Sequence, residues 1–301
     1  LEFRRVLFRS HILKYGVNKI DRGLLNISEQ KKCVRNSMGF DYQGDSTVFS
    51  IMFSADGTYS DSFAQRFWPA KAKLDQFCRH IGETTTFLKN EVSIHETPVI
   101  IFLPKITESF LEHYFLTNIN GSLVVNGRSA FSWADFEKNK KVWREDLSLV
   151  IDNTVPGAIG SYHCTSEGVA GGKMAAIECG CLKTPILNIK YAQKTGLAPT
   201  PQPVNGGGFF LKAGQMEDYR HMIKNIEKGI VVCSILGMHT QDYTNGNFSL
   251  TADQCLVIKD GEIIGKTKKV ITGNIFHIFN AENTRFARFE GEDNPALLYV
   301  K

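Results

Sequence analysis

The segment that decides the fold reads LGMHTQDYTNGNFSL and occupies residues 236–250. It joins an apolar run, Ile230 to Leu236, to an alternating run, Phe248 to Ile258. Its centre is polar and contains glycine and asparagine, which are typical of turns. The pattern therefore predicts a strand, a functional loop and a second strand.

Three polar side chains gather in this loop: His239, Thr240 and Asp242. Gly237 and Gly246 flank them, and glycine lets the backbone bend freely or approach another chain closely. A capped hairpin loop without chemistry explains the same residues and is preferred on spacing alone. The alternative is a site in which His239 and Asp242 take part in catalysis.

The rest of the C-terminal third is predicted to be mostly β-structure. Further strands are expected at Glu262–Ile271, Arg285–Phe289 and Ala296–Val300, with a turn at Asp260-Gly261 and a short helix at Asn274–Ala281.

The N-terminal third predicts a β-hairpin followed by a long helix. Two alternating runs between Ser46 and Trp68 flank Asp56-Gly57, a strong hairpin turn pair. Pro69 is tolerated in a first helical turn, and apolar residues then recur at helical spacing to about Asn90.

A polar segment that ends in proline, residues 91–98, is the expected linker between two domains. The chain is therefore predicted to be an α+β protein. A partial N-terminal α/β domain, residues 11–92, precedes a β-rich C-terminal domain, residues 93–301.

The middle of the chain gives two weaker predictions. Residues 131–145 are charged and aromatic, which favours a surface loop with a short helix. Residues 188–195 have a helical pattern that stops at Gly196, the usual place for a C-terminal glycine cap.

The first ten residues, LEFRRVLFRS, resemble a translated sequencing adapter. The first methionine is Met38, which also indicates an N-terminally truncated chain. Residues 1–10 are therefore predicted to be an artefact and are excluded from the fold prediction. A short basic amphipathic arm is the alternative.

Composition excludes several classes of partner. Of the net charge of +4, the first ten residues supply +2, so no electrostatic case for nucleic-acid binding remains. No apolar run reaches the ~18 residues of a membrane span. The seven cysteines are odd in number and scattered, which suits reduced thiols in a cytoplasmic protein.

The sequence offers few metal-ligand or nucleophile patterns. Cys179-Gly180-Cys181 and His163-Cys164 hold ligand-type side chains, but the paired C-x2-C spacing of structural zinc sites is missing. Neither HExxH nor HExxxH occurs, so no metal and no cofactor is predicted. Cys164 with His163, or Cys233 with His239, are the conceivable nucleophile pairs, and buried thiols are the simpler interpretation.

From about Thr47 onward the chain resembles the TldD/PmbA family, and the PmbA (TldE) branch in particular. Five stretches carry the resemblance: TPVIIFLP (97–104), SEGV (166–169), the segment 180–196, GMHT with GNFSL (237–250), and GEIIG (261–265). The last two stretches are the most specific.

In that family the TldD branch carries HExxxH and a later cysteine as metal ligands, and it cleaves unstructured peptides. The PmbA branch lacks these ligands and pairs with it. At the corresponding helix this chain reads SFLEHY, residues 109–114. The resemblance therefore implies a non-metal subunit that partners a TldD-like metallopeptidase, or itself as a homodimer.

The resemblance also implies where such a subunit would contact peptide or partner. The residues expected to shape a substrate cavity or interface are Gly237, Met238, His239, Thr240, Gly246, Phe248, Ser249, Glu167 and Gly168. Two other functions stay open: an autonomous hydrolase that uses His239 and Asp242, and a non-enzymatic homodimeric interaction protein.

Overall fold

The structure is a computed structural model that describes residues 13–37, 39–56, 59–203 and 207–301. The predicted adapter segment, residues 1–10, lies outside the described residues, as do Met38 and Gly57. In the part of the chain that is described, no helix is long and apolar enough to cross a membrane.

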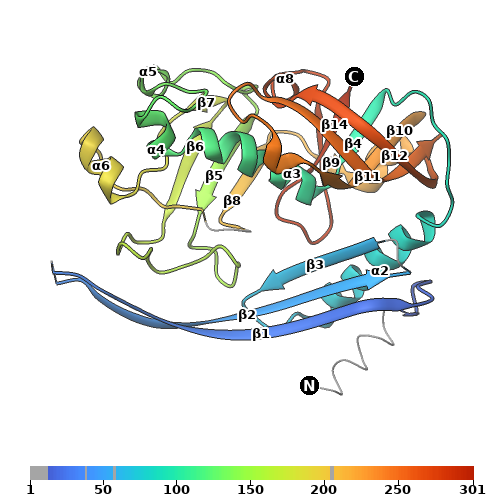
Figure 1. The fold of residues 1–301 in the computed structure, drawn as a ribbon, viewed down its shortest axis with the longest axis horizontal. Helices are drawn as coiled ribbons and strands as arrows, with labels where there is room; N and C mark the ends of the chain where they lie inside the picture. The colour runs from blue at the N-terminus through green and yellow to red at the C-terminus, as the bar shows by residue number, and fades with distance from the viewer. Residues whose placement is uncertain (1–12, 38, 57–58, 204–206) are drawn as a thin grey trace.

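An antiparallel sheet and one long helix form the N-terminal layer (Figure 1). Its strands, in the order β1-β2-β3, are β1 (Ile20–Arg35), β2 (Asp41–Ala55) and β3 (Tyr59–Gln65). The helix α2 (Lys71–Phe87) follows, and its Phe77 packs on Phe63 of β3 with ring centroids 4.9 Å apart. The predicted hairpin and helix are confirmed, whereas the long strand β1 was not predicted.

A seven-stranded mixed sheet, in the order β12-β11-β10-β4-β14-β13-β9, forms the centre of the C-terminal part. Its strands are β4 (Val99–Phe102), β9 (Glu217–Asp218), β10 (Lys228–Leu236), β11 (Asn247–Lys259), β12 (Glu262–Asn274), β13 (Arg285–Arg288) and β14 (Ala296–Val300). Strand β4 pairs with β10 on one edge and β14 on the other. Its continuous apolar run is therefore buried, as expected for a central strand.

A four-stranded antiparallel sheet, in the order β7-β6-β5-β8, lies beside it (Figure 1). Its strands are β5 (Leu147–Asp152), β6 (Lys173–Glu178), β7 (Cys181–Leu182) and β8 (Phe209–Ala213). The helices of this part are α3 (Pro104–Phe110), its π-helical continuation η1 (Leu111–Leu116), α4 (Gly121–Val125), α5 (Trp133–Glu137), α6 (Ile189–Thr195), α7 (Tyr219–Lys224), the 3-10 turn η2 (Met238–Thr240) and α8 (Ile275–Ile278). The α+β class is confirmed.

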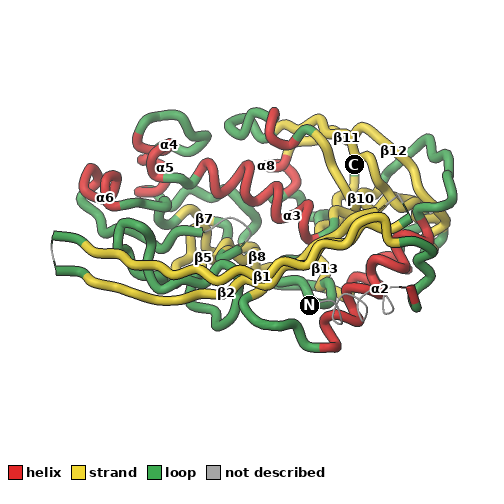
Figure 2. The backbone as a smooth tube through the Cα atoms, turned by 60° about the horizontal axis from the view of Figure 1, so that its bottom comes forward, coloured by secondary structure: helices red, strands yellow, loops and turns green. Residues whose placement is uncertain are grey.

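The hydrophobic core crosses the predicted domain boundary at residues 92 and 93. One cluster of buried side chains joins Ile51 and Ile81 of the N-terminal layer to Val231 and Leu298 of the seven-stranded sheet. Figure 2 shows β1 and β2 as a long ribbon that runs along the length of the molecule. The division into domains 11–92 and 93–301 stays a prediction.

Residues 131–145 correct one expectation. The short helix α5 is present, but the segment does not lie wholly on the surface. The side chain of Trp143 is 0% exposed and packs between Phe115 and Phe279, with ring centroids 4.7 and 4.8 Å away. The expected helix and the largely exposed segment are present, and the surface prediction fails only at single rings such as Trp143, because charged neighbours dominate the local hydropathy.

Candidate functional site

The predicted loop, residues 236–250, lies against the helix formed by α3 and η1. His113 Nε2 on η1 is 2.9 Å from the backbone oxygen of Gln241. Tyr114 donates its hydroxyl to the backbone oxygen of Asn247 at 2.8 Å. The helix that the family resemblance assigns to the metal-binding motif and the GMHT segment therefore meet in space. We call this contact the helix–loop junction.

The Gln241 side chain closes the loop on itself. Its Nε2 donates to the backbone oxygen of Gly237, and its Oε1 accepts from the backbone N–H of Ser249, both at 2.9 Å. Gly237 has φ +95°, a left-handed conformation that glycine adopts without a steric penalty. The Gln241 side chain thus ties the start of the loop at Gly237 to Ser249 in the first residues of β11.

Asp242 is engaged in a local turn. One carboxylate oxygen accepts from the Thr244 backbone N–H at 2.8 Å and from its hydroxyl at 2.6 Å. The other oxygen accepts from Asn245 Nδ2 at 3.1 Å. Hydrogen bonds from Thr244 lower the pKa of Asp242. The carboxylate therefore stabilises an Asx-type turn.

The remaining predicted residues of the loop divide between surface and core. His239, Thr240 and Ser249 are exposed, whereas Met238 is half-buried against the main core. Phe248 is buried, and its ring centroid is 5.1 Å from that of Phe110 on α3. The apolar residues of the loop thus anchor it to the core, and its polar residues are exposed to solvent.

Gly246 is buried at a position that leaves no room for a side chain. Its φ is +73°, and a Cβ atom at this position would lie 2.5 Å from the ring of Phe276. A larger residue would therefore push the loop away from α8.

Glu167 and Gly168 lie on a different loop. Glu167 accepts a hydrogen bond from the backbone N–H of Ile189, at the start of α6, at 3.1 Å. Gly168 has φ +82° and lies beside the ring of Phe40, near the tip of the β1–β2 hairpin. The structure brings residues 237–249 together, and it places these two residues with other partners.

The ligand-type side chains considered for zinc are also placed. His163 stacks on Tyr42 with ring centroids 4.5 Å apart, and its neighbour Cys164 is buried. Cys179 is exposed and Cys181 half-buried. Over residues 13–301, apart from the undescribed positions, no group of three or more His, Cys, Asp and Glu side chains is arranged to hold a metal ion.

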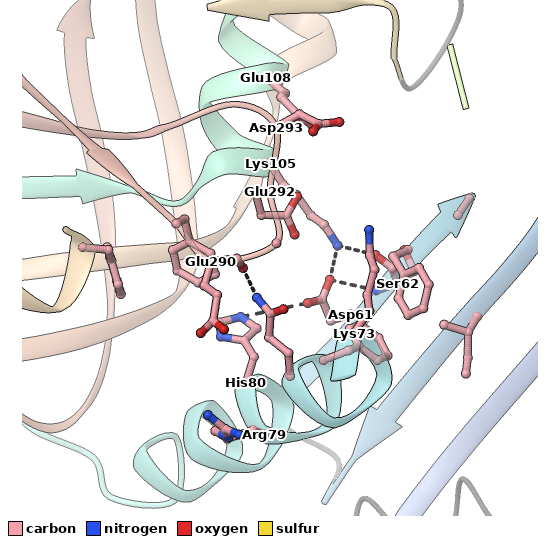
Figure 3. Close-up of a pocket in the computed structure, with 18 of the residues that line it drawn as sticks. Asp61, Ser62, Lys73, Arg79, His80, Lys105, Glu108, Glu290, Glu292 and Asp293 are labelled. Atoms are coloured by element: carbon pink, nitrogen blue, oxygen red, sulfur yellow. Dashed lines mark hydrogen bonds and ion pairs between the residues drawn. The ribbon is translucent and has the colours of Figure 1, made fainter. Parts of the chain in front are cut away.

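A cavity of about 800 Å³ lies between the N-terminal layer and residues 288–293, and sequence reasoning missed it (Figure 3). At its centre Lys105 of α3 donates to Asp61 Oδ1 and to the backbone oxygen of Ser62 on β3. His80 of α2 lies 3.9 Å from the other oxygen of Asp61. These residues come from three different elements, and their spacing in the sequence matches no known motif.

Burial shifts the titration of several groups around this cavity. It lowers the pKa of His80, raises the pKa of Glu108 and raises the pKa of Glu292 to about 7. Glu108 accepts from Asn294 Nδ2 at 3.0 Å. Figure 3 shows Glu292 beside Lys105. Lys105 therefore lies among several carboxylates of this cavity.

The chain is similar to several known proteins. The profile of the PmbA/TldA metallopeptidase C-terminal domain matches residues 95–287. An uncharacterized protein from Methanocaldococcus jannaschii is 21% identical over 257 residues, which cover 81% of this chain and 59% of that protein. A metalloprotease from Methanothermobacter thermautotrophicus is 26% identical over 186 residues, which cover 58% of this chain and 40% of that protein. The chain thus spans about half the length of these relatives.

The solved structure of TldE from Thermococcus kodakarensis has the same fold. The TM-score is 0.77 at 21% identity, and the match covers 92% of this chain and 67% of TldE. The fold therefore defines an α+β protein of the same architecture as TldE. Because the family profile spans more than half of its residues, the chain belongs to the PmbA/TldD family.

Proposed function

We propose that this chain is a PmbA/TldE-like subunit of a TldD-type metallopeptidase complex that acts on unstructured peptides. It would lack its own metal centre and would shape the substrate cavity and the subunit interface. The proposal rests on family membership and on one observation, the contact of His113 with the backbone of Gln241.

That contact supports a structural role for the helix at the junction. A catalytic zinc site needs three protein ligands and one open position. Here His113 and Tyr114 are directed to backbone oxygens of the loop, and Asn118 Nδ2 donates to the Tyr243 oxygen at 2.6 Å. The side chains of this helix thus hold the loop in place and present its exposed residues outward.

An extended peptide is the substrate class that suits this role, since strand edges and glycine-rich loops recognise a peptide through backbone hydrogen bonds. We place the complex in the cytoplasm, because all seven cysteines are free thiols. Partner and substrate would meet at the exposed residues His239, Thr240 and Ser249.

Reconstitution tests the proposal. The purified chain is assayed for cleavage of an unstructured reporter peptide, alone and with a TldD-like subunit that carries HExxxH. We expect cleavage only in the mixture. Cleavage by this chain alone would instead support an autonomous hydrolase, and a mixture no more active than the TldD-like subunit alone would indicate an interaction protein.

Substituting His239 refines the test. If the loop shapes the cavity or interface, His239→Ala lowers the joint activity, while His95→Ala, an exposed histidine outside the loop, leaves it unchanged. Equal joint activity of wild type and His239→Ala would leave this loop without the proposed role.

A further inference from the structure

The hairpin that joins β6 to β7 carries two cysteines at its turn. Glu178 pairs with Cys181 across the hairpin, so Cys179 and Gly180 form the turn between them. Cys179 has φ +47° and Gly180 has φ +75°. Positive φ at both central residues is the mark of a type I′ turn. Cys179 is exposed, Cys181 is half-buried, and both are free thiols. The turn therefore presents two reduced sulfurs to oxidants in solution.

The fold alone does not account for a cysteine at the first position of this turn. Asn, Asp and Gly are the residues favoured there in a type I′ turn. Elsewhere in the described ranges, the non-glycine residues with left-handed φ are Asp56, Asn139 and Asp260. Because Cys179 is exposed, it gains little packing in this conformation. A local rule that is broken without a structural gain points to a functional position.

The two cysteines are close enough along the backbone to be bridged. The residue between them, Gly180, is left-handed. Helical dihedral angles of either hand set Cα atoms two residues apart at about 5.5 Å. Disulfides join cysteines whose Cα atoms are about 4.4–6.8 Å apart. A disulfide within the turn therefore needs only a small adjustment of the backbone.

The backbone of the turn is bonded to the segment that holds Trp143. The Gly180 oxygen accepts the backbone N–H groups of Val142 at 2.8 Å and of Trp143 at 3.0 Å. The Gly180 N–H donates to the Leu147 oxygen at 2.8 Å. Trp143 in turn packs on Phe115 of η1, the helix of the helix–loop junction. A change in the dihedral angles of the turn therefore acts first on the backbone around Trp143.

We propose that Cys179 and Cys181 form a reversible disulfide by exchange with a small disulfide such as oxidised glutathione, and that this oxidation loosens the backbone around Trp143. The ring that the disulfide closes contains Gly180, so the dihedral angles of Gly180 must adjust and its hydrogen bonds weaken. This site goes beyond the proposed function and does not depend on it.

The exchange balances without any further reactant. The exposed Cys179 thiolate attacks one sulfur of the small disulfide and expels one thiol. The Cys181 thiolate then attacks the Cys179 sulfur of the mixed disulfide and expels the second thiol. Two protein thiols are oxidised to one disulfide, and the small disulfide is reduced to two thiols, which take up the two protons.

Mass spectrometry tests the disulfide, because trypsin releases residues 174–183 with both of these cysteines and no other. The full chain is incubated with oxidised glutathione, alkylated and digested without reduction. We expect this peptide to be about 2 Da lighter and unalkylated, and dithiothreitol to restore it. Cys33 is the matched control, because it is exposed and neither β1 nor β2 holds a second cysteine.

The glutathione concentration is raised until Cys33 carries a glutathione adduct. If residues 174–183 then hold alkylated thiols or glutathione adducts, the proposed disulfide is wrong. Cys181→Ser should stop at the glutathione adduct of Cys179, because the second thiol is gone.

Hydrogen–deuterium exchange tests the link to Trp143. In the oxidised wild type, peptides that cover residues 141–148 should exchange about fivefold faster than in the reduced protein, as the loss of one neutral hydrogen bond would give. Glutathione should leave this rate unchanged in Cys181→Ser. Equal exchange in the reduced and oxidised wild type would overturn the link between the turn and Trp143.

Discussion

Replacing Gln241 with Ala removes the side chain that closes the loop of the helix–loop junction. Two short hydrogen bonds are lost, to the Gly237 oxygen and from the Ser249 N–H, both 2.9 Å long, together with a longer one to Thr240 Oγ1 at 3.4 Å. Each neutral hydrogen bond contributes about 0.5–1.5 kcal/mol, so the pair contributes about 2 kcal/mol. Ser249 is exposed and water can replace one partner, so we expect the loop to lose about 1–2 kcal/mol of local stability.

Hydrogen–deuterium exchange measures this loss directly. Peptides that cover residues 236–250 should exchange about tenfold faster in Gln241→Ala, since 1.4 kcal/mol corresponds to a factor of ten. Gln241→Glu is the matched control, because it keeps an acceptor for the Ser249 N–H and loses the donor to Gly237. Its exchange rate should lie between those of wild type and Gln241→Ala.

An unchanged exchange rate in Gln241→Ala would refute this reasoning. If Gln241→Ala leaves exchange in residues 236–250 at the wild-type rate, the loop is not held by this side chain. The description of the junction as a preorganised surface would then be wrong.

Three further substitutions test the fold and the cavity. Trp143→Ala should lower the free energy of unfolding by about 3–5 kcal/mol in denaturant titrations, because a fully buried ring is lost. Gly180→Ala places a Cβ atom 2.3 Å from the Trp143 oxygen at φ +75°, so it should destabilise more than Gly196→Ala, which has φ +72° but nothing within 4 Å. Glu292 has a folded-state pKa of about 7, raised by burial above the ordinary 4.5, so its folded form holds a proton that the unfolded form releases. Stability should therefore fall as pH rises from 4.5 to 7. In thermal melts this fall should be smaller for Glu292→Gln, by at most about 1 kcal/mol, because the carboxyl group is desolvated in the cavity while the residue as a whole stays open to solvent, which screens the effect.

Local patterns predicted those elements whose partners are close in sequence. The hairpin and helix between residues 46 and 90, and the β10–β11–β12 meander, carry their own turn residues and periodicity. Strand β1 escaped prediction because only one of its residues, Val34, is fully buried, so it shows little apolar alternation. Strand β1 pairs with β2 through backbone hydrogen bonds, which do not depend on the side chains and so leave no pattern in the amino-acid sequence.

The candidate site residues were likewise predicted where they are neighbours in sequence and missed where they are not. The GMHT loop was found because its residues are consecutive, whereas its contact with His113 was not predicted. The cavity around Lys105 brings together Asp61, His80 and Glu292, which are separated by long stretches of chain. No spacing rule links such positions, and only tertiary packing of α2 and β3 against α3 places them side by side.

The central proposal is that this chain has no metal centre of its own and serves a metal-binding partner. The most direct measurement is the zinc content of the purified chain after equilibration with excess zinc and desalting, together with peptide cleavage by the same sample. We predict substoichiometric zinc and no cleavage until a TldD-like subunit is added. One equivalent of zinc per chain, with cleavage in the absence of any partner, would contradict the claim.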